Sequence, residues 1–119
     1  MSGAGSERRL TARLARFFAA PVGEPSGPSP LVDLGDDAAV VPRPPGAVVL
    51  CCDPVVAGVH FTAADAPALV GRKVVNRNLS DLAAMGALPD WLLLSLVLPR
   101  GTAAGWRDAL LGGVRRAAR

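Results

Sequence analysis

Several carboxylates in this chain stand where a secondary-structure element is expected to begin, end or be interrupted. Asp36 and Asp37 follow Gly35 in "LGDDAAVV", and Asp53 closes the apolar run "AVVLCCD". Asp81 lies in "NRNLSDLAAMGA", a helical stretch whose polar groups would be costly to bury without partners. Mg²⁺ prefers such oxygen ligands and shares its shell with phosphate and water. The pattern favours a magnesium site, although a turn explains Asp36 alone equally well and an exposed helical acid explains Asp81 alone better.

Other catalytic chemistries find little support in the sequence. The chain has no GxxxxGK[ST] phosphate loop, no GxGxxG fingerprint, no CxxC pair and no GxSxG elbow. His60 is the only histidine, which excludes a zinc site built from several imidazoles. Cys51 and Cys52 are adjacent in an apolar run, and nothing near them in the sequence would activate a thiol. They are interpreted as buried structural cysteines.

Helices and strands are expected in the order α-β-β-α-β-α. In chain order they are a helix over 7–19 capped by Ser6, strands over 38–41 and 47–53, a helix over 67–85, a strand over 91–99 and a helix capped by Thr102. The helix over 67–85 has the clearest limits, with Pro67 at its start and Gly86 after its end. The first two strands are expected to form an antiparallel hairpin. The order predicts a mixed α/β (α+β) fold, not a doubly wound parallel sheet.

Composition limits the class of protein. The chain has 119 residues, half of them hydrophobic and 4% aromatic, which predicts one domain, or part of one, with an aliphatic core. No apolar run is long enough for a membrane span, and no secretory signal is recognised. The net charge of +3 conceals a segregation, because two arginine-rich terminal stretches are basic and the middle of the chain is net negative. The terminal stretches are interpreted as solvated helix faces and not as a nucleic-acid surface. Two adjacent cysteines are no disulfide framework, so a cytoplasmic location is expected.

Taken together, the motifs resemble the N-terminal half of the thiamine-monophosphate kinases, in the superfamily of aminoimidazole ribonucleotide synthetase and selenophosphate synthetase. "GSERRLTARLARF" is similar to the opening helix of that family and "LGDDAAVV" to its Gly-Asp-Asp metal motif. "CCDPVVAGVHF" and "GRKVVNRNLSDLAAMGALPDWLLLSLVLP" are similar to its second motif and to its signature helix and strand. The first motif is shared across the superfamily, whereas the segments "AGVHF" and "NLSDLAAMGALPDWLLLSLVLP" are specific to this branch.

The resemblance implies a domain organisation. An N-terminal helix would occupy 1–20 and a flexible Pro/Gly loop 21–30. The N-terminal domain of the aminoimidazole ribonucleotide synthetase-like fold would occupy 31–119, with a mixed, mainly antiparallel sheet and helices on one face. In the family, two subunits pair through these sheets, so a homodimer is expected. The family's next motif, Gly-Gly-Asp-Thr, and its C-terminal domain would lie beyond Arg119, so no residue is assigned to ATP.

The resemblance also implies an activity. Its members transfer the γ-phosphoryl group of ATP to thiamine monophosphate and form thiamine diphosphate, with several Mg²⁺ ions. Asp37, Asp53 and Asp81 would bind magnesium, with Asp36 beside them, and His60 would contact the thiamine phosphate. No protein nucleophile is needed, because positioning and electrostatics carry most of such catalysis.

Two features leave alternatives open, namely the cysteines at 51 and 52 and the absence of the family's Gly-Gly-Asp-Thr motif from residues 1–119. The family usually has Ser or Thr where this chain has Cys51 and Cys52, and a thiol is a poor magnesium ligand. Only the backbone carbonyls of these cysteines could then serve the metal. The chain is expected to be the front part of a kinase, either truncated or completed by a second polypeptide. The alternative is a non-catalytic, stand-alone dimerisation or binding module, or a degenerate fragment of the family.

Overall fold

The computed structural model describes residues 3–19, 29–32, 38–42 and 45–119. The chain divides into two compact units, Met1–Ala47 and Val48–Arg119. The predicted metal motif at Asp36 and Asp37 lies outside the described residues. All other predicted site residues belong to the second unit.

The first unit contains helix α1, Gly3–Ala19, and one strand-like pairing. The helix includes the expected range 7–19 but begins before Ser6, so the prediction of Ser6 as its N-cap was wrong. Val40 forms an antiparallel bridge with Val32, and its N–H donates to the Val32 carbonyl at 2.8 Å. The expected hairpin of 38–41 with 47–53 is not seen among the described residues. Pro42 follows this segment directly, and proline cannot donate to a continuing ladder.

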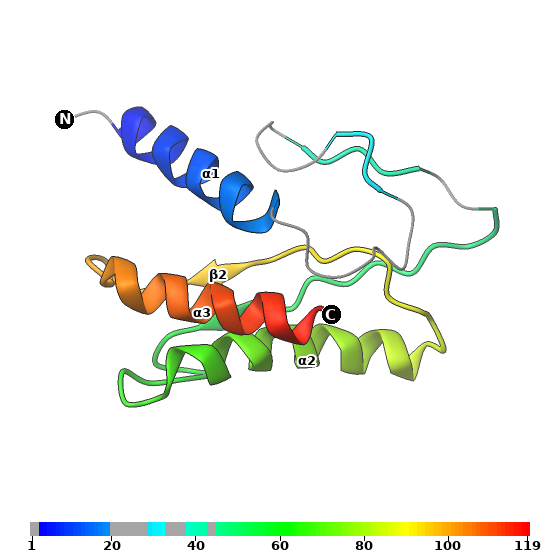
Figure 1. Ribbon diagram of the computed structural model, residues 1–119. Coiled ribbons are helices and arrows are strands. Elements are labelled where there is room, and N and C mark those ends of the chain that lie inside the picture. The colour runs from blue at the N-terminus through cyan, green and yellow to red at the C-terminus, as the bar shows by residue number, and fades with distance from the viewer. Residues whose placement is uncertain (1–2, 20–28, 33–37, 43–44) are drawn as a thin grey trace. The chain divides into compact units, whose positions relative to one another are not determined.

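The second unit is built as a strand–helix–strand crossover followed by a helix (Figure 1). Strand β1, Val55–Val56, pairs in parallel with β2, Leu96–Val97. The expectation of a mainly antiparallel sheet was wrong for this pair. The reason is topological, because the intervening helix α2, Pro67–Ala84, returns the chain to the end from which β1 started. A mixed α/β fold class is retained.

The strands are shorter than the sequence predicted. Of the range 91–99, only two residues form a strand, and 47–53 forms none in the part of the chain described. Val48, Val49 and Leu50 in that range are exposed, with 82% of the Leu50 surface accessible. The apolar run over 47–53 predicts a buried strand, but a strand needs a neighbouring strand to pair with and a surface to pack against. The described residues provide neither for this segment.

Helix α2 confirms the helix predicted from Pro67 to Met85. Its last helical residue is Ala84, Met85 is the C-cap, and Gly86 follows with a φ of 66°, a left-handed conformation that glycine adopts at little cost. The chain enters α2 through a turn in which the backbone N–H and the hydroxyl of Thr62 donate to Oδ2 of Asp65, at 2.6 and 3.0 Å. Both helix limits predicted from sequence thus have a local structural cause.

The Thr62–Asp65 turn predicts a pH-dependent contribution to stability. Hydrogen bonds from the Thr62 backbone and hydroxyl lower the pKa of Asp65 below its ordinary 3.8. Because the native pKa is lowered, the stabilisation is present above the unfolded pKa and is lost as the pH falls through the native value. We expect the Tm advantage of the wild-type chain over Asp65→Asn to shrink below about pH 4. Thermal melts of both proteins from about pH 6 to about pH 2 measure this, and a pH-independent difference would contradict it.

Helices α2 and α3 (Ala104–Ala117) lie side by side and run in the same direction (Figure 1). Their contact is between backbones, because glycines stand at the crossing. A Cβ atom on Gly71 would lie 2.1 Å from the Leu110 carbonyl oxygen, and one on Gly113 would lie 2.1 Å from that of Ala68. The two glycines therefore set how closely the helices approach.

An aliphatic core surrounds this crossing, as the composition predicted. Its buried hydrophobic residues are Val55, Phe61, Val70, Val74, Val75, Leu110, Leu111 and Val114. Phe61 stacks on Trp106 with ring centroids 5.6 Å apart. Thr102 was wrongly predicted as the cap of α3: Ala103 is the N-cap, and the Thr102 hydroxyl donates to the Pro99 carbonyl at 2.7 Å instead.

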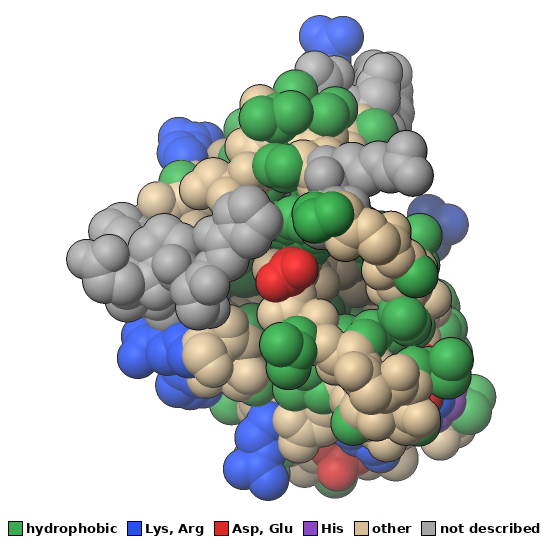
Figure 2. Space-filling view, turned by 90° about the vertical axis from the view of Figure 1, so that its right-hand side faces the viewer, with side chains coloured by type: hydrophobic (Ala, Val, Ile, Leu, Met, Phe, Trp, Pro, Cys, Tyr) green, Lys and Arg blue, Asp and Glu red, His purple; other side chains and the backbone are tan. Residues whose placement is uncertain are grey.

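Figure 2 shows hydrophobic side chains at several separate places on the surface, among polar and basic ones. Exposed hydrophobic residues of the second unit include Val59, Leu69, Met85, Leu88, Leu93 and Val97. None of the helices that the structure describes has the length and apolar character required to cross a bilayer. The exposed hydrophobic residues of the second unit are thus not part of a membrane-spanning helix among the described residues.

Candidate functional site

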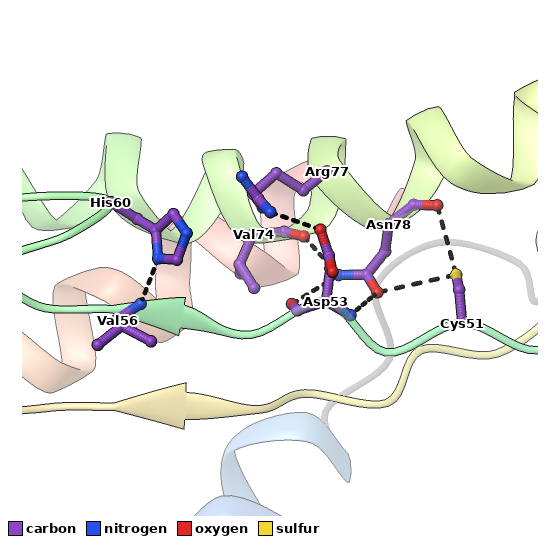
Figure 3. Close-up of polar contacts among 7 residues, drawn as sticks. All are labelled: Cys51, Asp53, Val56, His60, Val74, Arg77 and Asn78. Atoms are coloured by element: carbon purple, nitrogen blue, oxygen red, sulfur yellow. Dashed lines mark hydrogen bonds and ion pairs between the residues drawn. The ribbon is translucent and has the colours of Figure 1, made fainter.

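Asn78 ties helix α2 to the segment that precedes β1 (Figure 3). Its Oδ1 accepts the backbone N–H of Asp53 at 2.8 Å, and its Nδ2 donates to the Asp53 carbonyl at 3.3 Å. The same Nδ2 donates to the Val74 carbonyl at 2.8 Å. Only 5% of Asn78 is exposed, so these bonds satisfy a buried amide that would otherwise be costly. This contact joins the second predicted motif to the signature helix, and it fixes the backbone from which the Asp53 carboxylate projects.

The Asp53 carboxylate is bound by a cation from the same helix. The Arg77 guanidinium contacts Oδ2 of Asp53 at 2.5 Å, and both side chains are partly exposed, by 36% and 39%. Arg77 and Asn78 are consecutive, so one turn of α2 holds both the backbone and the side chain of Asp53. Sequence reasoning missed Arg77, although a basic residue beside the signature motif was a visible signal.

The Cys51 thiol is turned toward this contact. Its sulfur lies 3.6 Å from the Asn78 carbonyl oxygen and 3.8 Å from Oδ1 of the same residue (Figure 3). Burial raises the pKa of the Cys51 thiol above its ordinary 9.0, and the negative charges of Asp81 and Asp53 raise it further. Cys51 is therefore a hydrogen-bonded thiol near neutral pH, but it is only partly buried and lies outside any strand, so its prediction as a buried strand residue was wrong. Cys52 is exposed, so its prediction as a buried residue was wrong.

The raised pKa predicts slow alkylation of Cys51. In a Cys52→Ser variant, Cys51 is the remaining thiol of the chain, and iodoacetamide reacts with thiolates. With metal removed by a chelator, we expect alkylation at about pH 8 to be at least several-fold slower than in the urea-unfolded variant, and to accelerate above about pH 9. Mass spectrometry measures the rate. Equal rates in the folded and unfolded forms would contradict the assignment.

Asp81 stands on the same helix, three residues after Asn78, with its side chain exposed. Asp81 and Arg77 are four residues apart on α2, so their side chains lie on the same side of the helix. The crowding of polar residues around Asp81 in the sequence suggested that they serve one common partner. The structure shows instead that they have different environments. Asn78 is buried and bonded to backbone, whereas Asn76 and Ser80 are exposed.

The side chain of His60, in the loop that follows β1, is fixed by a hydrogen bond from that strand. The Val56 N–H donates to Nδ1 of His60 at 3.0 Å, and Gly58 in the loop has a φ of 80°. Because Nδ1 accepts, the ring proton resides on Nε2, which is the atom able to donate to an anion. The Lys73 ammonium donates to the His60 carbonyl. Figure 3 shows the His60 ring beside Val56 of β1, whereas Asp53 lies before that strand, so the two predicted site residues are apart.

The donor set fits magnesium in its chemistry. Asp53 and Asp81 offer carboxylate oxygens to solvent, and oxygen is the ligand that Mg²⁺ prefers. The described residues contain no group of three or more His, Cys, Asp or Glu side chains placed to hold a metal ion. Mg²⁺ takes only one or two protein carboxylates in many phosphate-binding sites and fills its shell with water and phosphate. Two carboxylates, such as those of Asp53 and Asp81, would be enough for that use.

Comparison with known proteins places these residues in a family. Residues 35–119 match the family described as AIR synthase related protein, N-terminal domain. The chain is 40% identical over 89 residues to the thiamine-monophosphate kinase of Synechococcus elongatus, with 73% of the chain and 27% of the relative covered. It is 44% identical over 84 residues to that of Caulobacter vibrioides, with 70% and 24% covered. The corresponding values for the Escherichia coli enzyme are 46% over 67 residues, with 56% and 21% covered.

The chain thus spans about a quarter of the length of the curated relatives it matches. No solved structure matches it significantly. The family match covers the second unit entirely and includes Asp53, His60 and Asp81. The resemblance to the N-terminal part of thiamine-monophosphate kinases is confirmed, and the chain belongs to the family of AIR synthase related proteins, of which it contains the N-terminal domain.

Proposed function

We propose that this chain is the N-terminal part of a kinase that transfers the γ-phosphoryl group of ATP to thiamine monophosphate and yields thiamine diphosphate. The single observation that carries the proposal is the Asn78 contact, which places the second motif and the signature helix side by side around Asp53. The relatives named above also support the proposal, because they are thiamine-monophosphate kinases. A cytoplasmic location is part of the proposal.

Asp53 and Asp81 would hold magnesium, with Asp37 and Asp36 contributing from outside the described residues, and the carbonyls of Cys51 and Cys52 as further candidate oxygens. When bound, Mg²⁺ supplies positive charge that offsets the repulsion between two phosphate-bearing substrates. Asn78 keeps the Asp53 backbone in place, and Nε2 of His60 would donate to the phosphate of thiamine monophosphate. No side chain of this set acts as a nucleophile.

The proposal is tested by product formation in the complete protein. With ATP and Mg²⁺, thiamine monophosphate should be converted to thiamine diphosphate, and a chelator should stop the reaction. Asp37→Ala and Asp81→Ala should each lower turnover about 10²-fold or more, since each removes a group that acts as part of a unit. Asp90→Ala, an exposed carboxylate outside the site, is the control. Unchanged turnover in both site variants would contradict the proposal.

The exposed apolar run Val48, Val49 and Leu50 supports the proposal of a partner surface. We place a second copy of the chain there, as a homodimer through strand-like edges, since unpaired apolar edges pair readily. Light scattering of the purified protein would give twice the chain mass, and Leu50→Lys should shift it toward the monomer. A wild-type protein that stays monomeric would contradict the homodimer and direct the search to a second polypeptide that supplies the C-terminal half.

The alternative function is a non-catalytic dimerisation or binding module. It is favoured by Cys51 and Cys52, which stand where the resemblance implies Ser or Thr. The intact mass of the protein in its own cells separates the two. A mass well above 12.2 kDa supports the kinase. A mass equal to that value, with ATP bound no better than by Asp37→Ala, supports the module.

A further inference from the structure

The contact between Arg77 and Asp53 is a single-point ion pair. One terminal nitrogen of the guanidinium reaches Oδ2 of Asp53 at 2.5 Å, whereas strong arginine–carboxylate pairs are commonly bidentate. The Nε atom of Arg77 is buried and has no hydrogen-bond partner among the described residues. Both side chains are more than a third exposed, so water screens the pair and its net contribution is small. In its present position Arg77 therefore has an unsatisfied Nε donor, and breaking its contact with Asp53 would cost little free energy.

The Arg77–Asp53 pair lies at the candidate metal site, because Asp53 is one of the proposed metal ligands. The Asp53 backbone is fixed by Asn78, so its carboxylate remains in place whether or not Arg77 contacts it. Asp81 follows Arg77 by four residues on α2, so it places a second negative charge on the same side of the helix as Arg77. A guanidinium and a divalent cation cannot both occupy the same carboxylate oxygen.

We propose that Arg77 is an exchangeable counter-ion of Asp53, which neutralises the carboxylate when metal is absent and is displaced when a divalent cation binds. This inference rests on the proposed metal-binding role of Asp53. Arg77 thus sets the metal affinity of the site, and once released it carries a free guanidinium, with its unsatisfied Nε, beside the bound cation. A phosphate oxygen is the acceptor that such a group prefers.

The test is the Mn²⁺ affinity of the complete protein, measured by electron paramagnetic resonance without nucleotide. Arg77→Gln removes the competing charge and should bind Mn²⁺ about three- to tenfold more tightly than wild type. Arg72→Gln removes the same charge from an exposed position on the same helix, and should stay within about twofold of wild type. Circular dichroism and thermal melts of each variant exclude a folding defect as the cause.

Each outcome decides a different claim. If Arg77→Gln binds Mn²⁺ no more tightly than Arg72→Gln, while Asp53→Asn weakens binding, the counter-ion role is wrong and the metal site stands. If wild type binds no Mn²⁺, or Asp53→Asn binds as well as wild type, the metal role of Asp53 fails and the counter-ion role fails with it. Tighter binding by Arg77→Gln alone, abolished on adding Asp53→Asn, is the predicted result.

Discussion

Replacement of Gly113 by alanine is expected to destabilise the second unit by about 3 kcal/mol or more. The new methyl group would lie 2.1 Å from the Ala68 carbonyl oxygen and 2.8 Å from its Cα. Backbone atoms cannot move aside as a flexible side chain can, so α2 and α3 would have to separate and loosen the packing of Leu110 and Val114. Such a loss is a large share of the total stability of a small domain.

The neighbouring glycine is the matched control. A Cβ on Gly112 would meet only the Arg116 guanidinium, at 3.5 Å, an ordinary contact. Gly112→Ala should therefore stabilise the helix by about 0.5–1 kcal/mol, through helix propensity alone. Urea unfolding followed by tryptophan fluorescence compares the two, since Trp106 stacks on Phe61 in the core. A Gly113→Ala midpoint at or above that of Gly112→Ala would contradict the close backbone contact.

The second large effect is expected at Asn78. Asn78→Asp keeps the shape but replaces Nδ2, which donates to the carbonyls of Val74 and Asp53, by an oxygen that repels both. The substitution also places a negative charge at a site that is 5% exposed, beside the Asp53 carboxylate. We expect a loss of about 3 kcal/mol or more at neutral pH, because an uncompensated buried charge is costly.

Asn76 on the same helix provides the comparison. Its side chain is exposed, so Asn76→Asp should change stability by about 0.5 kcal/mol or less. The loss in Asn78→Asp should also diminish in acid, where the introduced carboxyl gains a proton and can donate again. Denaturant midpoints at about pH 7 and about pH 4 for both variants test this. Equal midpoints for the two variants at neutral pH would show that Asn78 does not hold Asp53.

Local signals in the sequence predicted the helices well. The limits of α2 depend on Pro67 and on Gly86, whose preferences act within a few residues. The strand pairing was predicted less well because it depends on distant residues. Val55 pairs with Leu96 and Val40 with Val32, and hydrophobic runs alone do not specify which partner or direction a strand takes.

The residues of the candidate site remain a prediction from sequence, and the contacts among them could not be predicted. Asp53 and Asp81 were identified from residue type and position, but the contacts of Asp53 with Asn78 and Arg77 were not. The crowding of polar residues around Asp81 suggested one charged partner, yet Asn78 is satisfied by the backbone of Asp53, 25 residues away. Glycine lowers helix propensity, yet Gly113 stands in α3 where a Cβ atom would lie 2.1 Å from the Ala68 carbonyl oxygen. These relations arise only when α2 packs against its neighbours.

Asn78 fixes the backbone of Asp53, and we propose that the Asp53 carboxylate thereby serves metal-dependent phosphoryl transfer. The most direct measurement is the rate at which the complete protein forms thiamine diphosphate from thiamine monophosphate and ATP, for wild type, Asp53→Asn and the exposed control Asp90→Asn. We predict a loss of about 10²-fold or more for Asp53→Asn, with Asp90→Asn unchanged. An Asp53→Asn protein that is folded and works within about twofold of wild type would contradict the account.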